Sequence, residues 1–214
     1  MPNAPSDRTR VRRVPQRGQY DRETVEAILD ETLISHIGFV HVGHPVVIPT
    51  LHARLGDRLY LHGSAASRML RTLEGGAHVC ATATLVDGLV LARSAFHHSV
   101  NYRSVVVFGQ ARLVEPEERL RALELFTEKL VPGRWPEVRP PTPQELKGTK
   151  VFELPLHEAS AKVRTGPPID DDEDYELPVW AGVLPLRTVV DPAQRDPRLD
   201  PAIETPGHVA EWRP

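Results

Sequence analysis

The sequence predicts a small antiparallel β-barrel of six or seven strands with helices packed at its ends. Short runs rich in β-branched residues are separated by Gly, Asp and Pro turn signals, as in "HIGFVHV", "PVVIPTLHARL" and "GDRLYLHG". Two other segments repeat apolar residues at helical spacing. Closing such a sheet removes its exposed edges, and a chain of 214 residues with 40% hydrophobic residues can bury one core. We therefore expect a mainly β domain with flanking helices.

The first helix is expected in "DRETVEAILDETLI" (21–34), because an Asp cap precedes acidic residues and one apolar face. Residues 1–19 are polar and basic, so they predict a flexible solvated arm. From 36 to 64, three runs predict a meander of three antiparallel strands. A short helix follows in "SRMLRTLEGG", ended by Gly75 and Gly76.

The middle of the chain returns to strands. "AHVCATATLV" and "DGLVLAR" predict a hairpin about Asp87-Gly88, and "NYRSVVVFGQARLV" (101–114) predicts a long strand with a bulge or bend at Gly109. Pro116 opens a second amphipathic helix that stops at Pro132-Gly133. After a Pro-rich segment with one helical turn, "KVFELPLHEASAKVRTG" supplies a last strand or strand pair.

The barrel domain is thus expected at 20–165, followed by a Pro-rich extension at 166–214. Its acidic run "DDDEDYE" is typical of a solvated linker. The apolar segment 177–190, which includes Trp180, needs a surface, so we expect it to lie along the body or along a partner subunit.

The composition of the chain indicates which kinds of partner it can bind. The chain has 26 Lys and Arg against 29 Asp and Glu, a formal charge of −3, which lacks the basic field that nucleic-acid binding requires. The lone Cys80 cannot form an internal disulfide, and "MPNAPSDRTRVRR" lacks the apolar stretch of a secretory signal. With no apolar run long enough to span a bilayer, we expect a cytoplasmic protein with no nucleic-acid and no membrane partner.

One predicted strand-to-helix corner has side chains suited to ligand binding. In "LYLHGSAASRML" (59–70), a strand turns into a helix at Ser64, Ser67 and Arg68. Hydroxyl donors, a fixed cation and the free N–H groups of a helix start suit a phosphate group. Ser at a helix start is also an ordinary cap, so the corner alone leaves both interpretations open.

A family resemblance rests on four stretches: "PVVIPTLHARLGDRLYLHGSAASRMLRTL", "TLVDGLVLARSAFHHSVNYRSVVVFGQARLV", "LVPGRWPEVRPPTPQELKGTKV" and "SAKVRTGPP". Together they cover most of residues 20–185. The chain resembles the pyridoxamine 5′-phosphate oxidase superfamily of FMN-binding split barrels, and especially its branch of flavin-nucleotide-binding proteins and nitroimidazole-resistance reductases. The resemblance implies a homodimer with FMN in the groove between its protomers.

The resemblance also implies roles for individual residues. The strand at Ile48, Pro49 and Thr50 would lie beside the isoalloxazine, with His62 and Gly63 flanking the flavin and Ser64, Ser67 and Arg68 at its phosphate. Tyr102, Arg103 and Ser104 would contact the flavin of the opposite subunit, and Lys162 and Arg164 would add a polar contact. Met69 replaces the usual Lys after Ser-Arg, so the resemblance implies either a weaker phosphate clamp or one that recruits Arg71 or Arg54 instead.

The expected activity is that of an FMN-dependent oxidoreductase, a reductase or oxidase of a small organic substrate. His62 and Tyr102 are the candidate catalytic residues, although a strand-end packing role for His62 and a surface ion pair for Arg103 or Lys162 stay open. Residues 177–190 do not match the family's pyridoxamine-binding segment, which argues against true pyridoxamine phosphate oxidase activity. No dinucleotide fingerprint is present, which leaves NAD(P)H open as a transient electron donor.

Two alternatives come from other classes: a flavin carrier or sensor without turnover, and a haem-binding split barrel. A haem protein would place one of His52, His62, His97 and His98 where its ring reaches iron. "HHS" itself lacks the spacing of a metal site, so no resident metal ion is expected. Trp135 and Trp180 are expected to pack, although either could cover a flavin ring.

Overall fold

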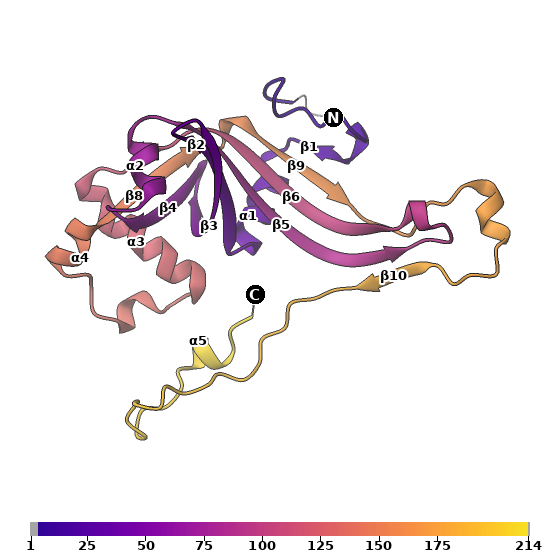
Figure 1. The fold of residues 1–214 in the computed structure, drawn as a ribbon. Coiled ribbons are helices and arrows are strands. Elements are labelled where there is room, and N and C mark those ends of the chain that lie inside the picture. Colours follow the sequence, from indigo (N-terminus) through magenta and orange to yellow (C-terminus); the bar gives the residue numbers. More distant parts are fainter. Residues whose placement is uncertain (1–3, 214) are drawn as a thin grey trace.

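The computed structural model describes residues 4–213, whose strands form one antiparallel sheet that curls into a barrel (Figure 1). The strand order is β1-β9-β6-β5-β2-β3-β4-β8-β7, and β10 pairs with β5 beside this path. The predicted fold class is confirmed. The sheet has ten strands rather than six or seven because it includes short edge strands that the sequence pattern does not reveal.

The strands are β1 (Gly18–Gln19), β2 (Ile34–His41), β3 (His44–Leu55), β4 (Arg58–Ser64), β5 (His78–Leu91), β6 (Ser99–Gln110), β7 (Arg112–Leu113), β8 (Thr149–Pro155), β9 (Ala159–Arg164) and β10 (Gly182–Pro185). The α-helices are α1 (Arg22–Glu31), α2 (Arg68–Glu74), α3 (Pro116–Leu130), α4 (Pro143–Gly148) and α5 (Gly207–Ala210). Short 3₁₀ turns are η1 (Pro15–Arg17), η2 (Ala95–His97), η3 (Trp135–Glu137), η4 (Leu156–Glu158) and η5 (Asp172–Glu176). No helix of these described residues has the length and apolar character needed to span a membrane.

The local signals place the helices where they were expected. Asp21 caps α1 by accepting a hydrogen bond from the Thr24 amide at 2.8 Å, and α1 buries one apolar face. The helix α2 ends at Gly75, and Gly76 adopts a left-handed φ of +77° that favours glycine. The predicted meander is also confirmed, since β2 pairs with β3 and β3 with β4.

Two details of the central strands differ from the prediction. The expected hairpin at Asp87-Gly88 is wrong, because β5 runs through it as one strand of 14 residues and turns back into β6 only after Leu91. A register shift between Val86 and Gly88 absorbs the turn signal as a bulge. The pairing of β5 with β6 has no register shift at Gly109. Gly109 instead lies close to Leu154, because a Cβ atom added at position 109 would stand 2.9 Å from the Leu154 side chain.

The core lies on both sides of β4. Leu59 and Leu61 are buried inside the barrel. Tyr60 belongs to a second apolar cluster that packs against Phe126 of α3. This alternation follows from the two-residue period of a strand, and it places α3 over the outer face of the sheet.

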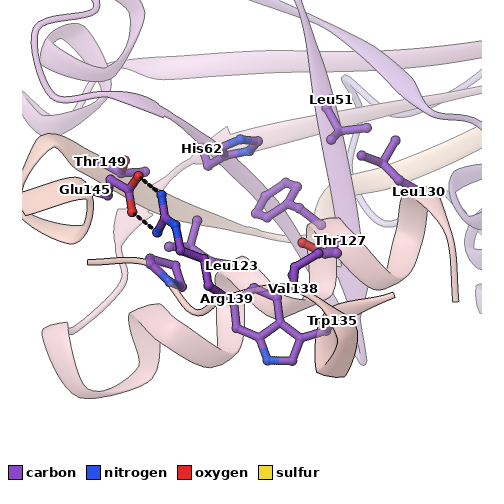
Figure 2. Close-up of a pocket in the computed structure, with 12 residues that line it drawn as sticks. Leu51, His62, Leu123, Thr127, Leu130, Trp135, Val138, Arg139, Glu145 and Thr149 are labelled. Carbon is purple, nitrogen blue, oxygen red and sulfur yellow. Dashed lines mark hydrogen bonds and ion pairs between the residues drawn. The ribbon is translucent and has the colours of Figure 1, made fainter. Parts of the chain in front are cut away.

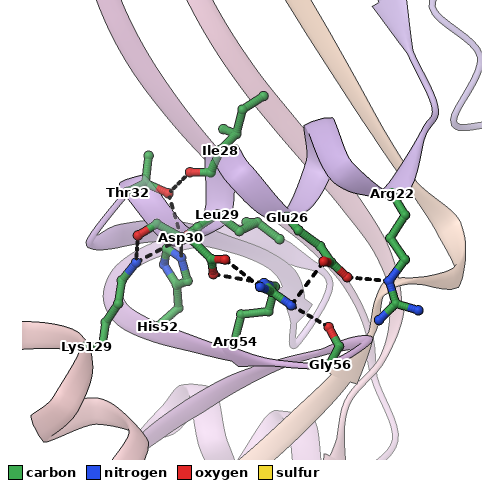
Figure 3. A network of polar contacts seen from close by, with 10 residues as sticks. All are labelled: Arg22, Glu26, Ile28, Leu29, Asp30, Thr32, His52, Arg54, Gly56 and Lys129. Atoms are coloured by element: carbon green, nitrogen blue, oxygen red, sulfur yellow. Dashed lines mark hydrogen bonds and ion pairs between the residues drawn. The ribbon is translucent and has the colours of Figure 1, made fainter. Parts of the chain in front are cut away.

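A polar network joins α1 to α3 and to the sheet (Figure 3). The buried His52 of β3 donates through Nε2 to the Leu29 carbonyl at 2.8 Å and accepts through Nδ1 from the Ser35 hydroxyl at 2.9 Å. Lys129 of α3 donates to the same Leu29 carbonyl at 3.1 Å. The last carbonyls of α1 thereby receive donors from β3 and α3, which fixes α3 against the barrel.

Candidate functional site

A cavity of about 520 Å³ opens between β4, α3 and the segment 135–149 (Figure 2). Its size falls within the range of small-molecule and cofactor sites. Its walls are mainly apolar, with a few polar groups at the margin. The lining residues are Leu51, His62, Leu123, Phe126, Thr127, Leu130, Trp135, Val138, Arg139, Pro141, Glu145 and Thr149.

His62 is the histidine that lines this cavity. Strand alternation turns it, like Tyr60, toward α3, while Leu61 faces the barrel core. Its ring lies 4.1 Å from the Phe126 ring, centroid to centroid, and its Nδ1 is buried without a hydrogen-bond partner among the described residues. Burial lowers the pKa of His62, so the ring is neutral and keeps an unshared lone pair.

The edge of the cavity is polar, and an ion pair holds its side chains in place. Arg139 donates two hydrogen bonds to the Glu145 carboxylate, at 2.7 and 2.8 Å. Together with the Thr142 amide, this lowers the pKa of Glu145 to about 2. Glu145 also forms a capping box with Thr142 at the start of α4. Arg139 is therefore held at the cavity by Glu145 although the residue as a whole is exposed.

The strand-to-helix corner follows β4 directly, two residues beyond His62. Ser67 is the N-cap residue of α2, but its side chain makes no capping hydrogen bond, and the Ser64 hydroxyl accepts from the Ala66 amide at 3.2 Å. The ion pair of this helix joins Glu74 to Lys150 and leaves Arg68 exposed. Within residues 4–213, the Ser67 hydroxyl and the Arg68 guanidinium therefore have no side-chain partner at this corner.

The barrel splits beside the corner. β3 pairs with β4 only from His52 to Leu55, and from His44 to Leu51 its ladder runs to β2. Residues 48–50 (Ile48, Pro49 and Thr50) thus have no ladder partner on the side facing β4 within the described chain. Gly63 lies at the end of β4, across this split from residues 48–50, so the split separates the two predicted flavin-contacting stretches.

Three other predicted site residues lie on β6 and β9, away from the cavity and the Ser67 corner. Tyr102, Ser104 and Lys162 share the outer face of β6 and β9, since Ser104 is paired with Lys162. Tyr102 lies beside Val86 and Arg164, whereas His62 faces α3, and Tyr102 is not among the residues that line the His62 cavity. The predicted joint site would need a second copy of the chain.

Arg103 points to the opposite face from its neighbours Tyr102 and Ser104. Its guanidinium binds Glu31 of α1 and Asp87 of β5, with Nη2 at 2.8 Å from an oxygen of each carboxylate. Of the two interpretations of Arg103, the ion pair is the one that the structure contains. Arg54 is likewise held, because its Nε donates to Asp30 at 2.8 Å, which leaves Arg71 as the nearer helper for Arg68.

The four candidate histidines do not converge. His52 is buried beneath α1, whereas His97 and His98 lie at the far end of the β5–β6 ribbon, where His98 contacts the Ser94 carbonyl at 2.9 Å. His97 forms a group of potential ligand atoms with Asp171 and Asp174, all within 4.8 Å of one another. Asp171 is exposed, and this group by itself does not indicate a metal ion.

Most residues of this cavity are not predicted from the sequence. The sequence pattern places Phe126 in an ordinary amphipathic helix, and it indicates a packing role for Trp135. The signal that could have marked the cavity margin is "TPQE" (142–145), a capping-box pattern that fixes Glu145 where Arg139 can reach it.

The fold and the split between β3 and β4 define a split-barrel protein. The family described as pyridoxamine 5′-phosphate oxidase matches residues 21–163, and the chain belongs to this family. No curated protein matches it. The resemblance noted from the sequence is thereby confirmed.

Solved structures extend this likeness beyond the barrel. The flavocytochrome Anf3 from Azotobacter vinelandii is 46% identical, with a TM-score of 0.95 and 99% of each chain covered. An FAD and haem binding protein from Mycobacterium smegmatis is 34% identical, with a TM-score of 0.87, 90% of this chain and 95% of that chain covered. A candidate 5-nitroimidazole antibiotic resistance protein from Bacteroides thetaiotaomicron is 22% identical, with a TM-score of 0.58 over 68% of this chain and 86% of that chain, and shares the fold.

Proposed function

We propose that this chain is a flavin- and haem-binding oxidoreductase that passes electrons between the two cofactors. The observation that carries the proposal is His62, a neutral imidazole with an unpaired nitrogen at the wall of a mainly apolar cavity. The descriptions of the relatives at 46% and 34% identity, a flavocytochrome and an FAD and haem binding protein, support it. The proposal combines two functions that the sequence suggested separately, a flavoprotein and a haem-binding protein.

The residues of the cavity fit a haem. Iron is bound by neutral imidazole, and burial keeps His62 neutral. Leu123, Phe126 and Val138 offer apolar surface to a porphyrin, and Phe126 restrains the imidazole plane. Arg139 is the cation at the margin, where it suits the carboxylates that a haem carries.

The split between β3 and β4 suits a flavin, which would lie there in a groove between the two strands. Ser67 and Arg68 would hold phosphate, and residues 48–50, which have no ladder partner on the β4 side among the described residues, would lie beside the ring system. We assign FAD rather than the FMN expected from the sequence, because FAD is named for the relative at 34% identity. Arg71, one turn beyond Ser67, would meet the second phosphate of FAD.

A flavin accepts two electrons from an organic donor and haem iron carries one electron at a time, so the pair can divide a two-electron reduction into single steps. Both proposed sites adjoin one strand, since β4 carries His62 toward α3 and leads into the Ser67 corner. Leu51, Leu123 and Phe126 give the wall around His62 its apolar character. NAD(P)H, binding transiently at the flavin, is the proposed donor.

We also propose a homodimer with the flavin at the subunit interface. The support is that Tyr102, Ser104 and Lys162 lie half-buried on an outer sheet face, apart from the groove of their own chain. In a two-fold dimer this face of one protomer meets the groove of the other. Tyr102 then contacts substrate or flavin from the partner, while Arg103 is left out of the site because it is already paired.

The cofactor assignment is tested by extracting the purified protein with acid and separating the released flavin by chromatography. FAD and haem in equal amounts support the proposal. FMN without haem would instead favour the simple flavoprotein that the sequence suggested. Absence of both cofactors after addition of FAD and haemin would contradict the proposal.

Replacing Arg68 by Ala is expected to weaken flavin binding by about 1.5 to 3 kcal/mol, the range for a charge-assisted hydrogen bond, without releasing haem. Titration of the apoprotein with FAD, followed by flavin fluorescence, measures the loss. Arg112, an arginine at the far edge of the sheet that pairs with Glu153, provides the control substitution to Ala. Equal affinities for the wild type and Arg68→Ala would place the phosphate elsewhere.

A further inference from the structure

The C-terminal extension contains a long exposed stretch between β10 and α5. Residues 184–205 form an unbroken run in which every residue is exposed. Large apolar side chains occur along the run, and Val189 and Ile203 are 79% and 51% exposed. Figure 1 shows this segment leaving β10 as an extended chain that runs to α5.

Both ends of this run are attached to the body. At its start, β10 pairs with β5, and the Leu186 amide donates to the Asp87 carbonyl at 3.0 Å. At its end, His208 of α5 lies 3.3 Å from the Glu137 carboxylate. Between them, within the described residues, no hydrogen bond or ion pair joins 188–205 to the rest of the chain.

Such a path is costly for an isolated chain. Fixing each residue of an extended segment costs conformational entropy, which contacts must offset. Internal bonds, such as those from Arg195 to the carbonyls of Asp200 and Ile203, stabilise only one local turn. The path is nevertheless shared with the solved flavocytochrome, because a TM-score of 0.95 over 99% of both chains includes the extension.

We propose that residues 184–206 form a strap that clasps a second copy of this chain. The strap leaves the body at β10 and returns at α5, so the second copy lies between the strap and the sheet. The outer sheet surface is also apolar and uncovered at Val47 and Val86, which are 63% and 51% exposed. A second copy covers the strap and this surface together, and two-fold symmetry makes the clasp reciprocal.

The inference rests on the homodimer of the proposed function but adds a distinct claim about the extension. Limited trypsin digestion of the full-length protein tests it, since Arg187, Arg195 and Arg198 offer cleavable bonds in the strap. A clasped strap resists cleavage at these bonds, whereas an extended free chain is cut at once. Analytical ultracentrifugation of the same sample gives the oligomeric state.

A double variant, Val189→Asp with Val190→Asp, is expected to raise the dimer dissociation constant by about tenfold or more and to speed cleavage after Arg195 by a similar factor. The matched control is Leu120→Asp on α3, a residue 43% exposed and outside the strap, which is expected to change neither quantity. Flavin and haem contents are read from the absorbance of each variant, so loss of cofactor is separated from loss of the clasp.

Carbodiimide coupling then identifies which copy carries the strap. Equal amounts of ¹⁵N-labelled and unlabelled protein are mixed, dissociated and reassociated, and carboxylates such as Asp191 and Asp196 are coupled to nearby lysines. Mixed-isotope pairs between strap and body support the clasp. Rapid cleavage at Arg195 in a dimer, or coupled pairs of one isotope only, would overturn the strap and leave the homodimer standing; a monomer would overturn both.

Discussion

Substitution of His62 by Ala is expected to abolish stable haem binding, with an affinity loss of more than about 100-fold. The imidazole nitrogen at the cavity wall is the ligand atom that the proposal assigns to iron, and no other histidine lines the cavity. The measurement is a haemin titration followed at the Soret band. Flavin binding, which depends on the Ser67 corner, is expected to remain.

Two controls separate ligand loss from damage to the fold. His157→Ala removes an imidazole whose side chain is 76% exposed and far from the cavity lining, so haem binding should not change. Free imidazole added to His62→Ala enters the space vacated by the ring and should restore the Soret band. A His62→Ala protein that binds haem like the wild type would show that the iron ligand lies elsewhere.

The second large effect concerns stability below neutral pH. Burial lowers the pKa of His52 to about 4 from an ordinary value of 6.5, and the charge of Lys129 acts in the same direction, against the Leu29 carbonyl. The unfolded chain therefore takes up this proton first, so stability falls as the pH drops from about 6.5 to 4. The shift corresponds to about 3 kcal/mol, lost in full below pH 4.

Urea unfolding across this pH interval measures the loss. The variant His52→Leu cannot take up the proton, so its unfolding free energy is expected to be lower at pH 7 but to fall less steeply toward pH 4. The exposed His98→Ala provides the control and should retain the slope of the wild type. Equal slopes for the wild type and His52→Leu would mean that His52 is not held neutral by the fold.

Much of the fold could be predicted from local patterns. The alternation in β2, β3 and β4, the Asp21 cap of α1 and the Gly76 turn each depend on neighbouring residues, and each is found as expected. The hairpin at Asp87-Gly88 was wrong because a turn signal was outweighed by pairing on both edges of β5, with β6 on one side and β10 on the other. Such pairing is non-local, so the sequence around Gly88 does not contain it.

The candidate site was predicted in part. His62 was singled out from its position at the corner, but strand alternation turns it to the α3 side, where Phe126 and Trp135 form the cavity. That cavity depends on where the Pro-rich segment after α3 lies, a tertiary choice that no local signal fixes. Arg103 shows the same limit, because its two carboxylate partners come from α1 and β5.

The central claim, electron transfer between flavin and haem in one protein, is tested most directly by anaerobic reduction with NADPH. The Soret and flavin bands are followed together in the reconstituted protein and in the Arg68→Ala variant after its flavin has been removed. Bleaching of the flavin band with haem reduction, and no haem reduction without flavin, is the predicted result. Haem that is reduced equally fast without flavin, or a protein that binds flavin but no haem, would contradict the account.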